Sequence, residues 1–395
     1  MKREAKDRAA KVANTDLRNM GAVRGDGFCS AFATDGTWKE LAISCVQQVL
    51  PVSPNASLAF LYVTDAMAGH LPDILNYLRE NTGIANWTGS VGLGICTTEK
   101  SVFERPGIAI MIADVPEDSF HIFDPIVNAA QNFDSETIDW IARKNPTLGI
   151  IHCDPRRVDL SQTIAAASAV SSTFFVGASS SARQLPLQIA NRVVEGGLSG
   201  VLMTPEVTTT VGITQGCLPL GPARQITKAI GNVVLEIEGR PALDVFRSDI
   251  GELHSRDIHR AAKQIFVGFP LDANDGGEYI VRYIVDVDVE RKSLVVSQTI
   301  APGNSILFCR RDTQSATADL ERMLKRLKLK SGGRPRGGLY FNCIARGPSM
   351  FGPDFEEVEM IRDILGDFPL VGFCGNGEIS QNRLYYYTGV LMLFT

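Results

Sequence analysis

Short apolar runs and helical apolar stripes follow one another along this chain in an order that recurs. The first set opens with the apolar run 58–65 and continues with a helical stripe over 71–78. A run ending at Val91–Gly92, a polar loop and the run 107–114 complete it. Short apolar runs are typical of buried strands, and apolar side chains three and four positions apart indicate a helix. This set therefore predicts the order strand, helix, strand, loop, strand.

Two later segments repeat this order. In both, the second strand is expected to end in Val-Gly, at Val176–Gly177 and Val371–Gly372, and the tetrapeptide Gly-Val-Leu-Met starts at residue 200 and again at 389. The shared order and spacing predict three copies of a β-α-β-β unit in which Gly92, Gly177 and Gly372 occupy equivalent places. Independent α/β segments with similar patterning are the alternative. The two sets comprise 148–154, 161–170, 173–181 and 200–204, then 338–346, 358–365, 370–380 and 389–394.

Other elements lie outside these sets. Thr37 and Glu40 have the spacing of a capping box, which predicts a helix that starts at 37. A strand, a turn and a short helix are expected over 232–246, two strands over 278–300, and a helix over 315–328. The fold class predicted from these patterns is α+β, with mixed β-sheets covered by helices.

Composition and charge narrow the class of protein. The chain has 395 residues, 45% of them hydrophobic, and a formal net charge of -5. Without a sustained basic stripe in the body of the chain, nucleic-acid binding is not favoured. No apolar run approaches the ~20 residues that span a bilayer. The eight cysteines form no Cys-x-x-Cys pair, which favours a reducing, cytoplasmic location.

The N-terminal segment is the one basic run. MKREAKDRAAK has no apolar stretch of the kind found in signal peptides. We interpret 1–36 as a partly flexible extension, in which this run is either a solvated helix or an arm that binds a membrane or a partner. Two domains are then expected, over 37–238 and 239–395.

The glycine-rich stretch LVGFCGNGEIS, 370–380, raises the question of a phosphate site. A dinucleotide fingerprint requires a helix immediately after the glycines, but LYYYTGVLMLF follows and predicts strand. If the three copies share a centre, the loops after their second strands converge on a polar pocket for a small ligand. Tight turns with solvated side chains are the alternative. The loop residues are Thr97 and Thr98, Ser179 and Ser180, and Cys374, Gly375, Asn376, Gly377 and Glu378.

Five segments resemble the FIST domain family. The stretch 212–246 resembles the junction of the FIST N- and C-terminal halves, and 277–312 resembles the centre of the C-terminal half. The stretch 342–352 together with 370–380 resembles the closing motifs of that half, and 28–50 resembles the opening helix. The matched motifs are Gln215-Gly216-Cys217, the Cys-x-x-Arg-Gly element at Cys343, Arg346 and Gly347, and Gly375-Asn376-Gly377-Glu378.

This resemblance implies a sensory module rather than an enzyme. Family members are regarded as intracellular domains that bind small ligands, amino acids among them. The resemblance adds Arg346, Gln215 and Cys217 to the candidate ligand-binding residues. A small carboxylate is a second ligand class, because the guanidinium of Arg346 can bind a carboxylate with two hydrogen bonds. A structural Arg346 that pairs with Glu378 or a backbone carbonyl is the alternative. The signal is expected to pass to a separate kinase, cyclase or adaptor, and residues 1–27 are too few for the F-box of eukaryotic members.

Two other functions stay open. Some family members resemble haem-binding nitric oxide sensors that act on histidine kinases, but no motif identifies a haem ligand among the five histidines. A thiol-dependent hydrolase would use Cys217, Cys343 or Cys374, none of which has a histidine within thirty residues. Neither a catalytic residue nor a metal site is predicted.

Overall fold

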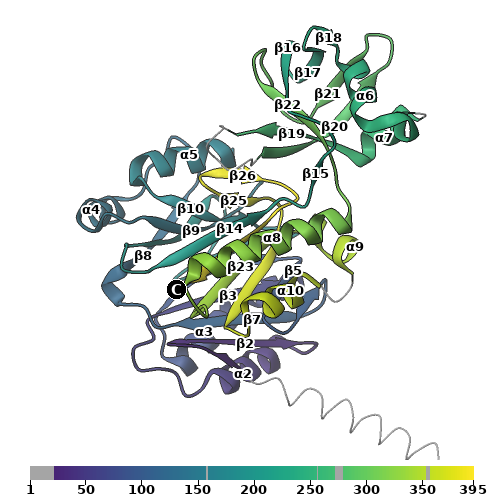
Figure 1. Ribbon diagram of the computed structural model, residues 1–395. Coiled ribbons are helices and arrows are strands. Elements are labelled where there is room, and N and C mark those ends of the chain that lie inside the picture. The colour runs from purple at the N-terminus through teal and green to yellow at the C-terminus, as the bar shows by residue number, and fades with distance from the viewer. Residues whose placement is uncertain (1–21, 157–158, 256, 272–278, 353–355) are drawn as a thin grey trace, which may run out of the picture. The chain divides into compact units, whose positions relative to one another are not determined.

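The computed structural model describes residues 22–156, 159–255, 257–271, 279–352 and 356–395. The basic run 1–11 lies outside these residues. The chain forms two compact units (Figure 1). Unit 1 contains the described residues up to Gly212, Leu324–Leu384 and Gly389–Thr395, and unit 2 contains Ile213–Met323 and Tyr385–Thr388. The boundary predicted at 238/239 thus falls inside unit 2.

The first sheet of unit 1 has the order β1-β2-β7-β3-β4-β11-β12. The three strands expected from the apolar runs are present, and the central strand β3 runs parallel to β4 and antiparallel to β7. On one face, α2 and α3 pack against the strands through a continuous apolar core. The elements are β1 Val23–Arg24, β2 Phe28–Thr34, α2 Trp38–Val49, β3 Leu58–Thr64, η1 Asp65–His70, α3 Leu71–Thr82, β4 Asn86–Gly92, β7 Gly107–Ala113, β11 Gln188–Ala190 and β12 Val193–Val194.

The capping box predicted for the opening helix is confirmed. The Thr37 hydroxyl accepts from the Glu40 backbone N–H, and the Glu40 carboxylate accepts from the Thr37 backbone N–H at 2.9 Å. Both hydrogen bonds satisfy backbone N–H groups at the helix start that have no partner inside the helix. Helix α2 therefore starts where the sequence indicates.

The second sheet has the order β26-β25-β10-β9-β13-β8, and α4 and α5 cover it. Its central strand β9 is parallel to β10 and antiparallel to β13. The elements are η2 Glu117–Ser119, β8 Phe120–Ile126, α4 Ser135–Lys144, β9 Leu148–Cys153, α5 Leu160–Ser171, β10 Phe174–Ser179, β13 Leu198–Met203, β25 Glu378–Ser380 and β26 Arg383–Tyr385.

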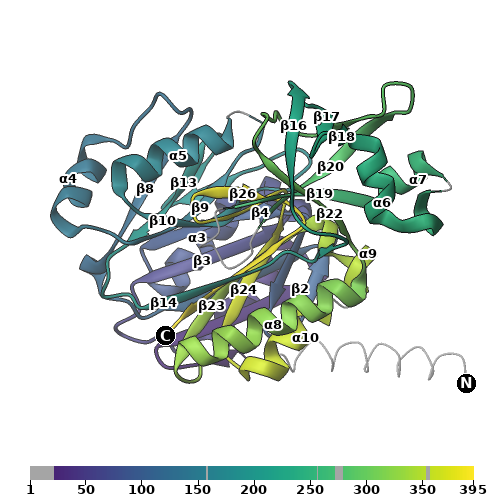
Figure 2. The same ribbon diagram turned by 45° about the horizontal axis from the view of Figure 1, so that its top comes forward.

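The third sheet has the order β14-β27-β23-β24-β5-β6. Its central strand β23 is parallel to β24 and antiparallel to β27. The last turns of α8 lie beside α10 (Figures 1 and 2), where the Lys328 ammonium donates to the Ile364 carbonyl at 2.7 Å. The elements are β5 Gly94–Thr97, β6 Ser101–Phe103, β14 Thr209–Thr214, α8 Thr313–Ser331, β23 Gly337–Cys343, η3 Ile344–Arg346, α9 Pro348–Phe351, α10 Glu356–Leu365, β24 Leu370–Gly375 and β27 Gly389–Phe394.

In each sheet, the second strand of the repeated set pairs with a strand from a distant part of the sequence. The β5–β6 hairpin pairs with β24, the β11–β12 hairpin pairs with β4, and β25 pairs with β10. The inner faces meet at aromatic rings from the three central strands. Tyr62, His152 and Phe341 lie with ring centroids 5.6 to 6.3 Å apart.

The glycines of the second strands allow close approach of neighbouring backbone. A Cβ at Gly89, Gly177 or Gly372 would lie 1.8 to 1.9 Å from a carbonyl oxygen of the facing central strand. The equivalence predicted for Gly92 is wrong in this respect. Gly92 faces Thr64 at the end of β3, so Gly89 makes the contact that Gly177 and Gly372 make.

Unit 2 is an antiparallel β-structure that closes on itself. Its sheet has the order β15-β22-β16-β17-β21-β20-β19, and an additional pairing joins β22 to β19. Helices α6 and α7 contribute to one apolar core with these strands. The elements are β15 Leu218–Pro219, β16 Arg224–Ile230, β17 Val233–Ile237, β18 Arg240–Pro241, α6 Ala242–Ser255, α7 Ile258–Gln264, β19 Ile265–Pro270, β20 Tyr279–Asp288, β21 Ser293–Val296 and β22 Ser305–Arg310.

None of the helices in the described part of the chain combines the length and the apolar character needed to cross a membrane.

Candidate functional site

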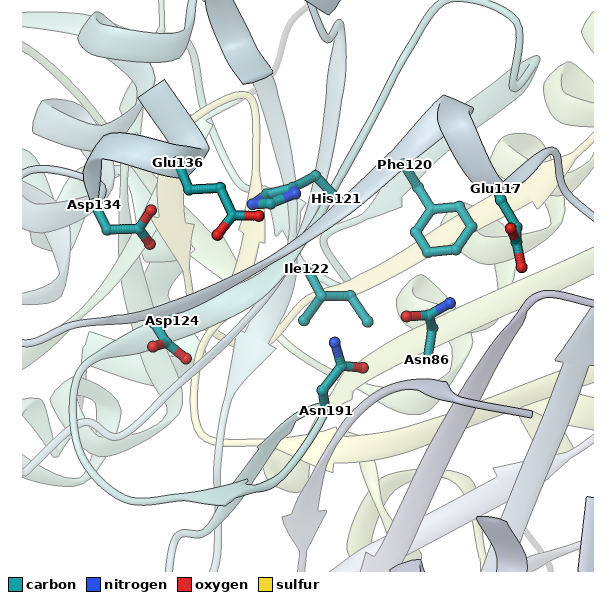
Figure 3. A pocket seen from close by; sticks show the side chains of 9 residues that line it. All are labelled: Asn86, Glu117, Phe120, His121, Ile122, Asp124, Asp134, Glu136 and Asn191. Atoms are coloured by element: carbon teal, nitrogen blue, oxygen red, sulfur yellow. The ribbon is translucent and has the colours of Figure 1, made fainter. Parts of the chain in front are cut away.

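A polar cavity of about 490 Å³ opens in unit 1 (Figure 3). Four carboxylates, two carboxamides and one imidazole line it, together with two apolar side chains. The volume is in the usual range for small-molecule sites. The lining residues are Asn86, Glu117, Phe120, His121, Ile122, Asp124, Asp134, Glu136 and Asn191.

Local structure brings these residues together from separate elements. Strand β8 is the edge of the second sheet, so one side of it is open to the cavity. Asp134 caps α4 by accepting from the Thr137 backbone N–H at 2.8 Å. Asn191 has a φ of 57° in the turn between β11 and β12, and its side chain accepts from the Trp87 N–H at 3.0 Å. The cavity thus lies where edges of the first and second sheets approach.

His121 is held in one orientation by α4. The Thr137 hydroxyl donates to Asp134 Oδ2 at 3.0 Å, so it accepts from His121 Nε2, also at 3.0 Å. The ring stacks on Trp140 with centroids 5.4 Å apart. Burial lowers the pKa of His121, against the opposing effect of Glu136 and Asp134. The neutral ring with Nε2–H therefore keeps Nδ1 as an acceptor.

The cavity has an excess of negative charge. Asp124 pairs with Arg192 at 2.8 Å, but both side chains are more than half exposed. Glu117 and Glu136 form no ion pair with any other described residue. Carboxylates and amide oxygens in this number suit a ligand with a cationic N–H group. Among the described residues, no His, Cys, Asp and Glu group could hold a metal ion.

The three strand-end loops meet in unit 1, and direct hydrogen bonds join them. Ser179 Oγ donates to the Asn376 carbonyl and Ser180 Oγ to the Val91 carbonyl, both at 2.6 Å. Ser181 Oγ donates to the Cys374 carbonyl and accepts from the Leu93 N–H. Asn376 is exposed, whereas Ser179 and Ser180 are buried. The polar groups that the sequence suggested for a ligand thus make internal contacts.

The other residues of the glycine-rich stretch pack closely. Glu378 is buried on β25, opposite Ala178 of β10. A Cβ at Gly375 would lie 2.7 Å from the Ala178 Cβ. The φ of Gly377 is 117°, which L side chains rarely adopt. The glycines therefore serve close packing and a turn.

Thr97 and Thr98 lie apart from these residues. Thr97 faces Val371 at the start of β24, and Thr98 Oγ1 accepts from the Leu370 N–H at 3.1 Å. Asn376 follows the opposite end of β24, Leu370–Gly375. Because a strand rises about 3.3 Å per residue, several residues of strand separate Asn376 from the two threonines. The two threonines and the glycine-rich stretch therefore do not share one pocket.

Arg346 is fully buried and pairs with Glu357, a residue that the sequence did not single out. Its Nε donates to Glu357 Oε1 at 2.9 Å. Tyr340 Oη donates to the same carboxylate at 3.0 Å and Asn342 Nδ2 at 3.3 Å. Burial and the Glu357 charge raise the pKa of Tyr340, so its hydroxyl stays protonated. The sequence analysis considered Glu378 or a backbone carbonyl as a structural partner of Arg346, but it did not consider Glu357.

The cysteines proposed as nucleophiles are buried. Burial, and next the neighbouring Cys96, raise the pKa of Cys374 well above its ordinary value. A thiol with a raised pKa is a poor nucleophile, because the thiolate is the reactive form. Cys343 is buried at the end of β23. Gln215 and Cys217 belong to unit 2, where Gln215 Nε2 donates to the Tyr279 carbonyl.

Neither His152 nor His121 lies in surroundings that fit haem. His152 is buried among Tyr62, Phe341 and Phe373, and its Nε2 lies 3.1 Å from Tyr62 Oη. His121 shares its cavity with four carboxylates, whereas haem requires apolar walls and carries two propionates of its own. These surroundings do not fit haem.

We expect His152 to make the protein sensitive to acid. Burial lowers its pKa to about 3, against about 6.5 in the unfolded chain. As the pH falls, His152 is protonated in the unfolded chain before it is protonated in the folded protein. Its contribution to the free energy of unfolding is therefore fully present above pH 6.5 and is lost as the pH drops toward 3. The loss attributable to His152 at pH 5 is about 2 kcal/mol.

Denaturant unfolding at pH 7 and pH 5 would measure this loss. The matched variant His152→Phe retains an aromatic ring without a titrating group, so its stability is expected to fall less between the two pH values. An identical pH dependence in the variant would contradict the assignment.

Comparison with known proteins identifies the family. The FIST N domain model matches residues 57–240 and the FIST C domain model matches residues 242–381. The chain belongs to the FIST family. FIST domains are associated with sensory signal transduction rather than catalysis.

Several similar proteins are uncharacterized. Rv0628c of Mycobacterium tuberculosis (strain ATCC 25618 / H37Rv) is 30% identical over 210 residues, which cover 51% of this chain and 55% of that protein. Mb0898c of Mycobacterium bovis is 29% identical over 210 residues, covering 51% and 54%. The chain thus spans about half the length of the curated relatives it matches. A PurLQS structure from Thermotoga maritima has 12% identity, covers 94% of this chain and 73% of that chain, and has a TM-score of 0.19, which is too low to support an inference.

The sequence analysis did not predict the polar cavity with its four carboxylates, which we call the acidic cavity. It weighed His121 only as a haem ligand and assigned no element between 115 and 147, although Asp134 and Thr137 carry a helix N-terminal pattern. The carboxylates come from η2, β8 and the start of α4, and only folding places them around one cavity.

Proposed function

We propose that this protein is a sensory module that binds a small, amine-bearing ligand in the acidic cavity. The observation that carries the proposal is the lining of four carboxylates around His121 and two carboxamides. An ammonium or guanidinium group offers N–H donors and positive charge to these acceptors. Basic amino acids and small polyamines are the ligands of this class.

A small carboxylate is less well supported as the ligand. The guanidinium of Arg346 is buried and already neutralised by Glu357. A second carboxylate there would displace that partner, which leaves one charge buried without compensation. Within the amino acid-like class, we therefore favour ligands recognised through their cationic group. The signal then passes to a separate protein.

The test is a binding screen of the purified chain at low salt. Calorimetry would compare basic amino acids and small polyamines with dicarboxylates of similar size. We expect Glu136→Gln to weaken binding of an amine by about five- to tenfold, since one charge interaction of about 1 kcal/mol is lost. Glu80→Gln removes an exposed carboxylate outside the cavity and serves as the control.

Variants of the strand-end loops separate this proposal from its rival. Asn376→Ala and Ser179→Ala are expected to leave amine binding unchanged. If they abolish binding while Glu136→Gln does not, the ligand belongs to the loops. Preferential binding of dicarboxylates would overturn the assignment of the acidic cavity.

We also propose that the three sheets of unit 1 derive from one repeated β-α-β-β unit. Each has its last strand, first strand and second strand side by side, in that order, which supports the proposal. The close approaches of Gly89, Gly177 and Gly372 supply the residue correspondence. An experimental structure whose three units fail to superimpose with these glycines aligned would contradict it.

A further inference from the structure

Helix α4 both supplies carboxylates to the acidic cavity and holds the imidazole that lies in it. The cap residue Asp134 and Glu136 in the first turn line the cavity (Figure 3). Thr137 and Trp140, the two buried residues of α4, are three positions apart and so share a face of the helix. Both contact His121, the first by a hydrogen bond and the second by ring stacking. One helix therefore fixes the imidazole relative to two of the carboxylates.

The single hydroxyl proton of Thr137 sets the direction of the hydrogen bonds around it. Its Oγ1 lies 3.0 Å from Asp134 Oδ2 and 3.0 Å from His121 Nε2. Burial raises the pKa of Asp134, but the hydrogen bonds from the Thr137 backbone and hydroxyl more than offset it, so the pKa lies below its ordinary value. An ionised carboxylate can only accept. The hydroxyl proton therefore goes to Asp134, and the oxygen accepts the proton of His121 Nε2.

The other ring nitrogen of His121, Nδ1, is left as an acceptor. No hydrogen bond joins it to any residue in the part of the chain that the structure describes. Stacking on Trp140, with the ring planes inclined by 24°, limits rotation of the imidazole. With its proton on Nε2, the neutral ring carries a lone pair on Nδ1. The cavity that His121 lines thus contains a neutral acceptor of fixed orientation beside its carboxylates.

A neutral acceptor and a carboxylate distinguish cations in different ways. The carboxylates attract any positive charge, including that of a quaternary nitrogen without N–H groups. The Nδ1 lone pair is satisfied only by a donor, which an ammonium or guanidinium group provides and a quaternary ammonium group does not. His121 therefore adds a requirement for an N–H group to the requirement for positive charge.

We propose that Thr137 is a positioning residue that acts through His121 and makes the acidic cavity select cations with N–H groups over quaternary cations. This inference rests on the proposed function of the cavity and narrows its class of ligand. Thr137 is fully buried, so it acts on the ligand only through the ring that it orients. Without its hydroxyl, nothing in α4 holds the proton on Nε2.

Heteronuclear NMR of the nitrogen-labelled, ligand-free chain at pH 7 tests the positioning role. A hydrogen-bonded N–H exchanges slowly with water, so the wild type should show a proton on Nε2 of His121 and none on Nδ1. His121→Gln assigns the signal by removing it. Thr137→Ser retains a hydroxyl and should retain the signal, whereas Thr137→Val has a similar shape without the hydroxyl and should lose it. A missing signal in the wild type, or a persistent one in Thr137→Val, would overturn the proposal.

Calorimetry tests the selection with putrescine and with its analogue in which both nitrogens are trimethylated. Thr137→Val should weaken putrescine binding about fivefold through the loss of one hydrogen bond and leave binding of the analogue unchanged. Thr137→Ser should restore most of the affinity for putrescine. The control is Thr163→Val, which changes a fully buried threonine of α5 whose hydroxyl bonds to no other described residue. It should alter neither affinity.

The outcomes separate this inference from the proposed function. Equal weakening of both cations in Thr137→Val would indicate a damaged cavity and overturn the selection. If putrescine binds and Glu136→Gln weakens it but Thr137→Val does not, the amine site stands and the role of Thr137 is refuted. If the Nε2 proton behaves as expected but neither cation binds, the proposed function fails and the selection with it. If Thr137→Val does not fold, the wild-type Nε2 signal and the affinities of Thr137→Ser decide.

Discussion

Cutting the chain at residue 241, between its two family segments, is expected to leave neither part folded. The FIST N and FIST C segments meet there, but the sheets do not separate at that position. The β5–β6 hairpin from the first part pairs with β24 of the second. Strand β25 from the second part pairs with β10 of the first.

The cut also divides unit 2. Strand β17 lies before residue 241 and pairs with β21, which lies after it. Each part would therefore lose strand partners and expose apolar faces of its sheets, and buried backbone groups that lose their partners are costly. The loss exceeds the marginal stability of a domain.

Circular dichroism and thermal unfolding of residues 1–240 alone and 242–395 alone would measure the effect. We expect no cooperative transition from either part. Co-expression is the control, since the pairings are non-covalent and a complex of the two parts is expected to recover folded structure. A cooperative transition in the isolated N-terminal part would refute the argument.

Replacing Glu357 by alanine is expected to destabilise the protein by about 3–5 kcal/mol. The side chains of Arg346 and Glu357 are both fully buried. Without Glu357, the buried guanidinium loses the carboxylate with which it pairs, and Tyr340 and Asn342 lose the acceptor that they share. Chemical denaturation of wild type and variant gives the difference in unfolding free energy.

Two controls identify the cause. Asp118→Ala breaks the exposed Lys144–Asp118 pair and should have little effect, because water screens exposed ion pairs. The double variant Arg346→Met with Glu357→Leu removes both charges and should recover most of the stability that Glu357→Ala loses. If Glu357→Ala is no more harmful than Asp118→Ala, the buried pair is not a stabilising unit.

Much of the local structure could be predicted from sequence. The apolar runs at 58–65 and 107–114 became β3 and β7, and the helical stripe at 71–78 became α3, because buried strands and amphipathic helices follow from short-range periodicity. The motif resemblance led to the correct family. The Val-Gly pairs predicted that Gly92 is equivalent to Gly177 and Gly372. In the structure, Gly89 instead makes the close backbone approach that Gly177 and Gly372 make.

The sites were harder to predict because they depend on contacts between distant segments. Arg346 was selected as a ligand anchor, but its carboxylate partner lies eleven residues later on another element. Ser179 and Asn376 were selected for a pocket, yet they bond to each other across 197 residues. A polar residue in a motif does not reveal whether its partner is a ligand or the protein.

The sequence by itself determined the strand and helix order within the three repeated sets, the start of α2 and the family. These follow from periodicity, capping and motifs, which act over a few residues. Only the tertiary structure decided which hairpin joins which sheet, which carboxylate neutralises Arg346, and which acidic side chains surround His121. Those outcomes depend on long-range burial and pairing, and a local pattern contains no information about the partner at the other end of the contact.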